Sequence, residues 1–279
     1  MSLRLLAVFA HPDDESFGVG ATLARYAAEG VELSLLTATR GDGGRFRGLA
    51  PGDPKHPGPD ELARIREAEL AAAASVLGIG HVVLLDYHDR QLDRVDPREM
   101  VTCIAGHLRR VRPHVVLTFG PDGVYGHPDH IAMAQFTAAA AVAAADPAFV
   151  FEAGQAPAAP HAVAKLYYTA WPESTWRAHE TAFKRWTSTV DGVERHAMPW
   201  PDWAITTVID ARPFWPTALR AVACHESQFA AYARLQELPA GLHEALWGWQ
   251  HYYRVFSTVN GGREKEHDLF AGLRTEGRG

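Results

Sequence analysis

The chain has 279 residues, of which 47% are hydrophobic and 22% are charged, and its formal net charge is -6. This is the composition of a soluble globular protein, and the length favours one large α/β domain. The acidic balance argues against a nucleic-acid partner, which would favour a basic surface. Cys103 and Cys224 lack the spacing of a zinc knuckle or a disulfide framework, which indicates a reducing compartment. No apolar run reaches the ~18 residues of a membrane span, so we expect a cytoplasmic protein without a membrane partner.

Strands and helices alternate along the first half of the chain. Nearly continuous apolar runs predict buried strands at 3–10, 31–39, 81–87 and 114–120. Helical spacing predicts helices at 17–29, 60–78, 97–112 and 127–145. Asp60 suits the N-cap of the second helix, and Pro128 suits the first turn of the last. The alternation predicts a three-layer, Rossmann-like sandwich with a mostly parallel sheet and right-handed crossovers.

Two segments stand apart from this alternation. In 41–59, ten of 19 residues are Gly or Pro, and a loop of this length is often functional. All eight tryptophans lie between Trp171 and Trp249. They can pack as a layer over the sheet, or one or two of them can line a pocket for the apolar face of a sugar ring. We therefore expect a single domain over 1–279, with a parallel core at 1–145 and a Trp-rich second half at 146–279 that completes the pocket.

Polar clusters follow two of the predicted strands. The sequence "AHPDDE" at 10–15 follows the first strand, and "PDGVYGHPDHI" at 121–131 follows the fourth. In an open parallel sheet, ligands bind outside the carboxyl ends of the strands. Both clusters are therefore expected at the same edge of the sheet.

The two clusters contain a possible metal-binding set. His11, Asp14, His127 and His130 would converge there, and two histidines with one carboxylate are typical of a catalytic zinc site with an open position for water. Either cluster alone could equally be a helix N-cap, because Asp and Pro favour helix starts. The occurrence of both favours a site, since a dication relieves the repulsion among crowded carboxylates.

The two motifs closely resemble those of the LmbE-like, or PIG-L, N-acetylglucosaminyl deacetylases. Further similar segments extend over nearly the whole chain: "TATRGDGG" (37–44, with Asp42 in the acidic position), "IREAELAAAASVLGI" (65–79), "LLDYHDRQL" (84–92, with Asp86 in place of the usual Gly), "ACHESQ" (223–228) and "EHDLFAGL" (266–273).

The resemblance implies a role for seven residues. His11, Asp14 and His130 would be zinc ligands, Asp13 the general base, and His127 the group that stabilises the oxyanion. Arg66 and Asp89 match positions that hold the sugar. The site suits Fe2+ as well as Zn2+. The implied substrate is a small-molecule N-acetylglucosaminide such as a glucosaminyl precursor of mycothiol or bacillithiol, and the sequence leaves the oligomeric state open.

The proposed roles agree with the chemistry of amide hydrolysis. Zinc lowers the pKa of its bound water toward ~7, and a nearby carboxylate such as Asp13 can take the proton and return it to the leaving amine. A protonated His127 can stabilise the oxyanion, and losing one such donor typically costs ~3–4 kcal/mol. Asp129 either orients a histidine ring or is a plain helix-start carboxylate.

Several residues keep a structural alternative. Arg66 could form an exposed ion pair with Glu69. Glu15 suits a helix start or a supporting contact, and a lone histidine such as His225 is more often structural. We see no convergent partner for His88.

Other functions remain open at this stage. A related amidase of thiol conjugates is one alternative. A nucleotide-binding oxidoreductase or transferase would need a third glycine where Leu23 stands, and it would meet negative charge at the pyrophosphate position. A non-catalytic sugar-binding module would not need a base such as Asp13.

Overall fold

A seven-stranded sheet forms the centre of the computed structural model, which describes residues 2–151, 158–183, 187–190, 192–229, 235 and 237–274. The strand order is β3-β2-β1-β4-β5-β9-β8. Pairing is parallel from β3 to β5, whereas β9 is antiparallel to both of its neighbours. The strands are β1 (Arg4–Phe9), β2 (Glu32–Thr39), β3 (His81–Tyr87), β4 (Val115–Thr118), β5 (Lys165–Thr169), β8 (Thr207–Asp210) and β9 (Trp249–Ser257). The predicted α/β fold with a mostly parallel sheet is confirmed.

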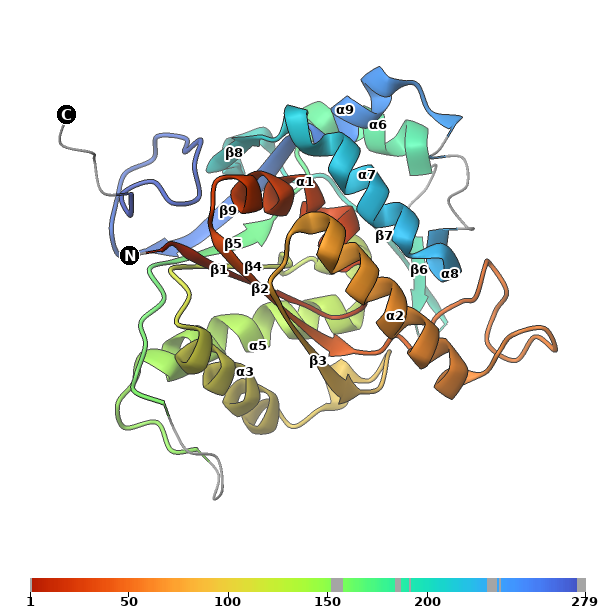
Figure 1. Ribbon diagram of the computed structural model, residues 1–279, viewed down its shortest axis with the longest axis horizontal. Helices are drawn as coiled ribbons and strands as arrows, with labels where there is room; N and C mark the ends of the chain where they lie inside the picture. The colour runs from red at the N-terminus through yellow and green to blue at the C-terminus, as the bar shows by residue number, and fades with distance from the viewer. Residues whose placement is uncertain are drawn as a thin grey trace.

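Helices cover both faces of the sheet (Figure 1). One face carries α1 (Asp14–Ala28), α2 (Pro59–Leu77) and α7 (Trp215–Cys224), and the other carries α3 (Pro97–Val111) and α5 (Pro128–Ala145). The shorter elements are α4 (Gly123–Gly126), α6 (Glu173–Phe183), α8 (Glu226–Phe229), α9 (Ala240–Trp247) and the hairpin of β6 (Thr187–Val190) with β7 (Val193–His196). Among the helices described, none is long and apolar enough to cross a bilayer.

The predicted helices of the first half are all present, with two differences at their starts. Helix α1 begins at Asp14, before the predicted residue 17, so the polar motif itself forms the first turn. Helix α2 begins at Pro59 after Gly58, which takes φ 88°. Asp60 therefore lies inside the first turn, and its prediction as the N-cap is wrong.

The tryptophans have no common environment. Trp247 is buried, whereas Trp203 is 86% exposed. Trp171 and Trp200 line cavities, and Trp186 lies outside the described residues. A uniform packing layer is therefore not formed. Both cysteines are free.

Strand β9 ties the end of the chain to its beginning. The Gln250 side chain accepts the Thr22 N–H (2.7 Å) and donates to the Gly18 carbonyl (3.1 Å), and the Tyr252 hydroxyl donates to Thr22 (2.7 Å). Helix α1 is thereby fixed from within the sheet.

A buried polar network holds the segment that follows β9. The Glu266 carboxylate accepts hydrogen bonds from Lys165 Nζ (2.6 Å) and the Tyr167 hydroxyl (2.7 Å). Although burial opposes ionisation, Asn260 and Lys165 lower the pKa of Glu266 to about 2. The carboxylate is therefore ionised in the folded protein at neutral pH.

Candidate metal centre and active site

The two polar motifs meet where adjacent strands β1 and β4 end. His11 follows β1, and Asp14 is the first residue of α1. His127 is the N-cap of α5, and His130 lies in the first turn of that helix. Because β1 pairs in parallel with β4, the two loops emerge side by side, as the sequence predicts.

His11, Asp14 and His130 have the spacing of three ligands around one ion. His11 Nδ1 lies 3.2 Å from His130 Nε2 and 3.6 Å from Asp14 Oδ2, and His130 Nε2 lies 3.4 Å from Asp14 Oδ1. Ligand bonds of ~2.1 Å at tetrahedral angles place donor atoms about 3.4 Å apart. Each Asp14 oxygen faces one of the two rings, and the three side chains have about the spacing that a tetrahedral dication with a fourth ligand needs.

The contacts of the His11 ring show which nitrogen faces this position. His11 Nε2 lies 2.9 Å from Asp89 Oδ1 and 3.1 Å from Asp129 Oδ2, so it carries the proton. The lone pair is then on Nδ1, toward Asp14 and His130. Although burial opposes it, Asp89 and Asp129 raise the pKa of His11, so the surroundings stabilise positive charge here.

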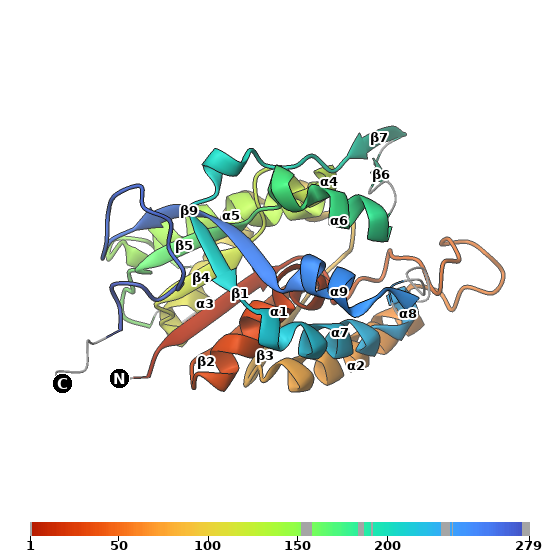
Figure 2. The same ribbon diagram turned by 90° about the horizontal axis from the view of Figure 1, so that it is seen from above.

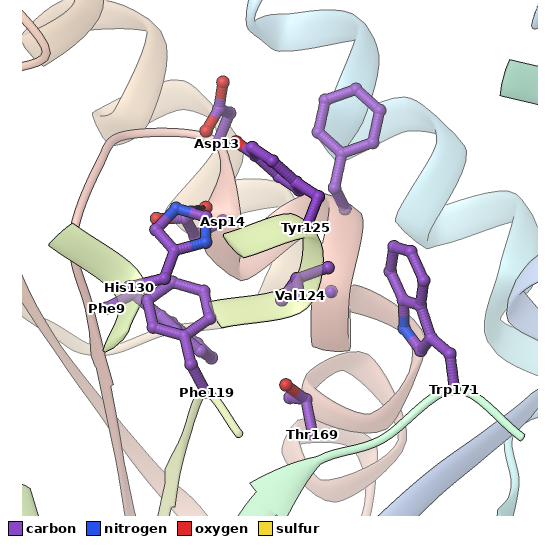
Figure 3. A pocket seen from close by; sticks show the side chains of 11 residues that line it. Phe9, Asp13, Asp14, Phe119, Val124, Tyr125, His130, Thr169 and Trp171 are labelled. Carbon is purple, nitrogen blue, oxygen red and sulfur yellow. Dashed lines mark ion pairs between the residues drawn. The ribbon is translucent and has the colours of Figure 1, made fainter. Parts of the chain in front are cut away.

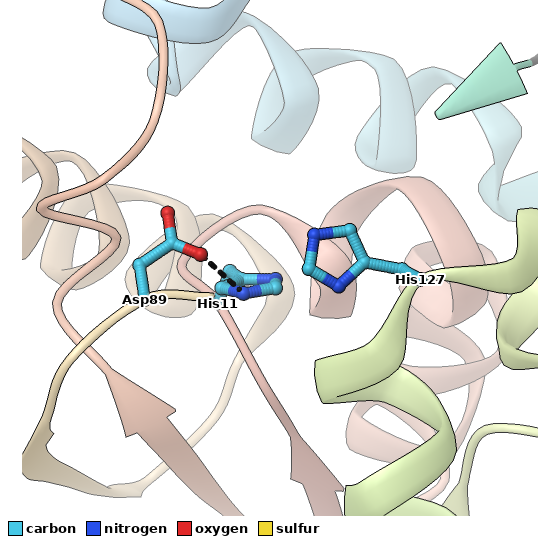
Figure 4. A group of neighbouring side chains, drawn as sticks. All are labelled: His11, Asp89 and His127. Carbon is cyan, nitrogen blue, oxygen red and sulfur yellow. Dashed lines mark ion pairs between the residues drawn. The ribbon is translucent and has the colours of Figure 1, made fainter. Parts of the chain in front are cut away.

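A second cluster of possible ligands, His11, Asp89 and His127, shares the same ring (Figure 4). Its Asp89 carboxylate faces His11 Nε2 at 2.9 Å, and that nitrogen carries the proton and is not free to bind a metal. The first set is the better fit for this reason.

Asp13 lies beside the three ligands without belonging to them. Its backbone has φ 124°, a strained conformation for a residue with a side chain. Burial raises the pKa of the Asp13 carboxyl to about 7, with Arg66 opposing the shift and Asp14 adding to it. A carboxyl with a pKa near neutral can accept and return a proton at physiological pH.

Arg66 is buried and supports this loop from α2. Its guanidinium contacts Asp13 Oδ2 (3.2 Å), donates to the Gly41 carbonyl (3.1 Å) and donates to the Pro12 carbonyl. A Cβ on Gly41 would lie only 2.1 Å from Arg66 Nη1, so glycine is needed there. The alternative prediction of an exposed ion pair with Glu69 is wrong, since the Glu69 carboxylate accepts from Ser227 instead.

His127 presents a donor to the site even when neutral. Its Nδ1 accepts the backbone N–H of Asp129 at 3.2 Å, so the proton of the neutral ring is on Nε2. Burial, together with neighbouring His11 and His130, lowers the pKa of His127 to about 3. This argues against the predicted protonated form, but a neutral imidazole still offers its Nε2–H.

Asp129 orients the histidine of the other motif. Its buried carboxylate contacts His11 Nε2 and accepts the backbone N–H groups of Arg90 (2.6 Å) and Leu92 (3.1 Å). Asp129 therefore contacts a ring nitrogen of His11, as the first of its two predicted roles requires. Through these two backbone hydrogen bonds the Asp129 carboxylate also holds the loop that follows β3 against the site. This loop contains Asp89, which contacts His11.

Glu15 and His225 form a buried pair that sequence reasoning missed. Glu15 Oε1 lies 2.7 Å from His225 Nε2, both side chains are fully buried, and Glu15 Oε2 accepts the Asp13 N–H at 3.0 Å. Burial opposes both charges, but each partner favours ionisation of the other, so the pKa of Glu15 is lowered and that of His225 is raised. In the sequence, the only indication of a role for His225 is the resemblance of "ACHESQ" (223–228) to a segment of the family.

Two cavities border the candidate centre. An apolar cavity of about 70 Å3 adjoins Asp13, Asp14 and His130 (Figure 3). A larger polar cavity of about 480 Å3 adjoins Asp89 and is lined by residues of the Gly/Pro-rich loop. His88, for which we expected no partner, contacts the Asp42 carboxylate at its edge (2.9 Å).

Comparison with known proteins agrees with this class of fold and site. The family described as GlcNAc-PI de-N-acetylase, PIG-L, matches residues 6–141. The 1D-myo-inositol 2-acetamido-2-deoxy-alpha-D-glucopyranoside deacetylase of Kineococcus radiotolerans is 35% identical over 310 residues, covering 97% of this chain and 83% of the relative. The Rhodococcus erythropolis enzyme of the same name is 33% identical and covers 98% of each chain.

Solved structures share the fold at lower sequence identity. The conserved protein TT1542 from Thermus thermophilus has a TM-score of 0.64 at 24% identity and covers 93% of this chain and 97% of its own. The N,N'-diacetylchitobiose deacetylase from Pyrococcus horikoshii has a TM-score of 0.62 at 18% identity, with coverage of 90% and 83%.

Fold and sequence together define the class as a hydrolase that acts on an amide and has a mostly parallel α/β sheet. The chain belongs to the PIG-L family, and it is a deacetylase.

Proposed function

We propose that the protein is a zinc-dependent deacetylase that removes the acetyl group from an N-acetylglucosamine conjugate of a small, polar molecule. The observation that carries the proposal is the spacing of His11, Asp14 and His130 beside the Asp13 carboxylate, which is not one of the three ligands. Iron(II) would suit the same donor set. When bound, the metal would supply a water of lowered pKa and polarise the amide carbonyl.

The residues around the metal ligands would transfer the proton, stabilise the oxyanion and hold the substrate. Asp13 takes the proton of the attacking water and returns it to the amine nitrogen as the C–N bond breaks. His127 donates from Nε2 to the oxygen that gains negative charge. Arg66 holds the Asp13 loop, and with Asp89 it would contact the sugar, as the resemblance implies.

The polar cavity supports a hydrophilic group beyond the sugar. It adjoins Asp89 and is lined by polar side chains: Asp42, Asp53, His56, His88 and Gln91. An inositol, as in the names of the relatives, would find hydrogen-bond partners there. The Gly/Pro-rich loop would then set the choice of aglycone.

Acetate release across a panel of N-acetylglucosaminides tests the proposal. The panel includes N-acetylglucosaminyl-inositol and a thiol conjugate. Free amine is measured together with acetate, because an amidase acting on the thiol conjugate would release an amine without acetate. Asp13→Asn is expected to retain bound metal and to lose at least about a hundredfold in kcat. Asp60→Asn, an exposed change in α2, is the matched control. A wild-type protein that is loaded with zinc and releases acetate from none of these compounds would overturn the proposal.

A further inference from the structure

The apolar cavity beside the metal ligands is larger than an acetyl methyl group requires. Its walls are mainly aromatic and aliphatic, with the side chains of Asp13 and Asp14 among them (Figure 3). The apolar lining consists of Phe9, Phe17, Gly18, Phe119, Val124, Tyr125 and Trp171, with Thr169. Such a surface favours a hydrocarbon over a sugar.

The size of the cavity can be compared with that of an acetyl methyl group. A single water molecule needs roughly 10–15 Å3 on the same measure. The cavity, at about 70 Å3, therefore has room for about five groups of that size, and a water on the metal held by Asp14 and His130 would take one of these places. A methyl group fills only one of these places.

The two cavities are lined by residues that contact different nitrogens of the His11 ring. The apolar cavity adjoins Asp14 and His130, which contact His11 Nδ1, whereas the polar cavity adjoins Asp89, which contacts Nε2. A secondary amide in its trans form directs its two substituents away from each other. With the sugar on the Asp89 side, the acyl substituent must extend into the apolar cavity.

We infer that this cavity is an acyl-chain site and that the enzyme hydrolyses linear N-acyl groups longer than acetyl, up to about six carbons. The inference rests on the proposed function, since it uses the same metal and the same amide. The reaction balances as a hydrolysis: water adds its oxygen to the acyl carbon, the C–N bond breaks, and a carboxylate and an amine are released. No further co-reactant is required.

A homologous series of substrates measures the depth of the cavity. We would compare N-acetyl, N-propanoyl, N-butanoyl, N-hexanoyl and N-decanoyl forms of one glucosaminide. Each buried methylene can raise kcat/KM by up to about fourfold. We expect kcat/KM of the butanoyl and hexanoyl forms to equal or exceed that of the acetyl form, and that of the decanoyl form to fall. A decrease of tenfold or more already at propanoyl would overturn the inference. Absence of acetyl hydrolysis would instead contradict the proposed function.

Gly18 offers a way to fill the cavity without disturbing the fold. It lies inside α1 on the cavity wall, and an added Cβ would meet nothing within 4 Å. Gly18→Leu should lower the ratio of hexanoyl to acetyl hydrolysis at least tenfold. Gly241→Leu in α9 is the matched control, since that glycine is also helical with open space around it. An unchanged ratio in the Gly18 variant would refute the assignment.

Binding to the metal-free protein provides a readout that does not depend on turnover. Saturation-transfer NMR with hexanoate and acetate as probes should show stronger transfer to hexanoate in the wild type. Gly18→Leu should abolish this preference. Equal transfer to both probes in the wild type would contradict an acyl-chain site.

Discussion

The Glu15–His225 pair gives a prediction in which stability and activity separate. Both side chains are fully buried, and their nearest atoms are 2.7 Å apart. Removing one partner of a buried ion pair leaves an uncompensated charge, at a cost of about 3–5 kcal/mol. His225→Leu is therefore expected to lower the free energy of unfolding by this amount, or the melting temperature by about 10 °C.

Removing both partners should restore stability. Replacement of a buried pair by apolar side chains is often neutral. The Glu15→Leu/His225→Leu variant is therefore expected to be more stable than His225→Leu. Its kcat should nevertheless be below that of the wild type, because the Asp13 N–H has lost its Glu15 acceptor and the strained loop loses an anchor.

Urea unfolding followed by tryptophan fluorescence, with metal content and kcat measured in parallel, tests these expectations. His267→Leu, an exposed histidine, is the control. The reasoning fails if His225→Leu costs less than about 1 kcal/mol, or if the double variant is less stable than either single one.

Three further predictions concern the site and the C-terminal network. His127→Ala should lower kcat by about 10²–10³-fold with bound metal unchanged, because an oxyanion donor is lost; loss of metal would instead mark His127 as a ligand. Asp129→Asn should weaken metal binding by about 10–100-fold in chelator competition, since it loosens the orientation of His11; unchanged affinity would contradict this role. The pKa of Glu266 is lowered to about 2, so its stabilisation is present above its usual pKa of 4.5 and is lost as pH falls from there toward 2. Glu266→Gln should therefore flatten the fall of the urea midpoint below pH 4.5, and parallel curves would refute it.

The first half of the fold could be predicted because its signals are local. Apolar runs of strand length alternate with helical periods, and a parallel sheet brings the ends of such strands to one edge. That rule alone placed His11 near His130, although 119 residues separate them.

The rest depends on contacts that leave no local pattern. Strand β9 alternates poorly in burial and inserts between β5 and β8, so neither its pairing nor its direction could be read from its residues. The burial of Arg66 arises from the turn at Gly41, and the pairing of Glu15 with His225 arises from the packing of α7 on α1. Tertiary packing, and not the local sequence, determines these contacts.

The insertion of β9 also sets the order in which a newly made chain can finish folding. Residues 249–257 complete the sheet between strands that were synthesised earlier, and they supply the hydrogen bonds that fix α1. A ribosome-bound chain that ends before residue 249 carries both His-Pro-Asp motifs but leaves the edge of β5 unpaired. Completion of the sheet, and of the contacts that fix the helix beginning at Asp14, therefore awaits residues that are synthesised after both motifs.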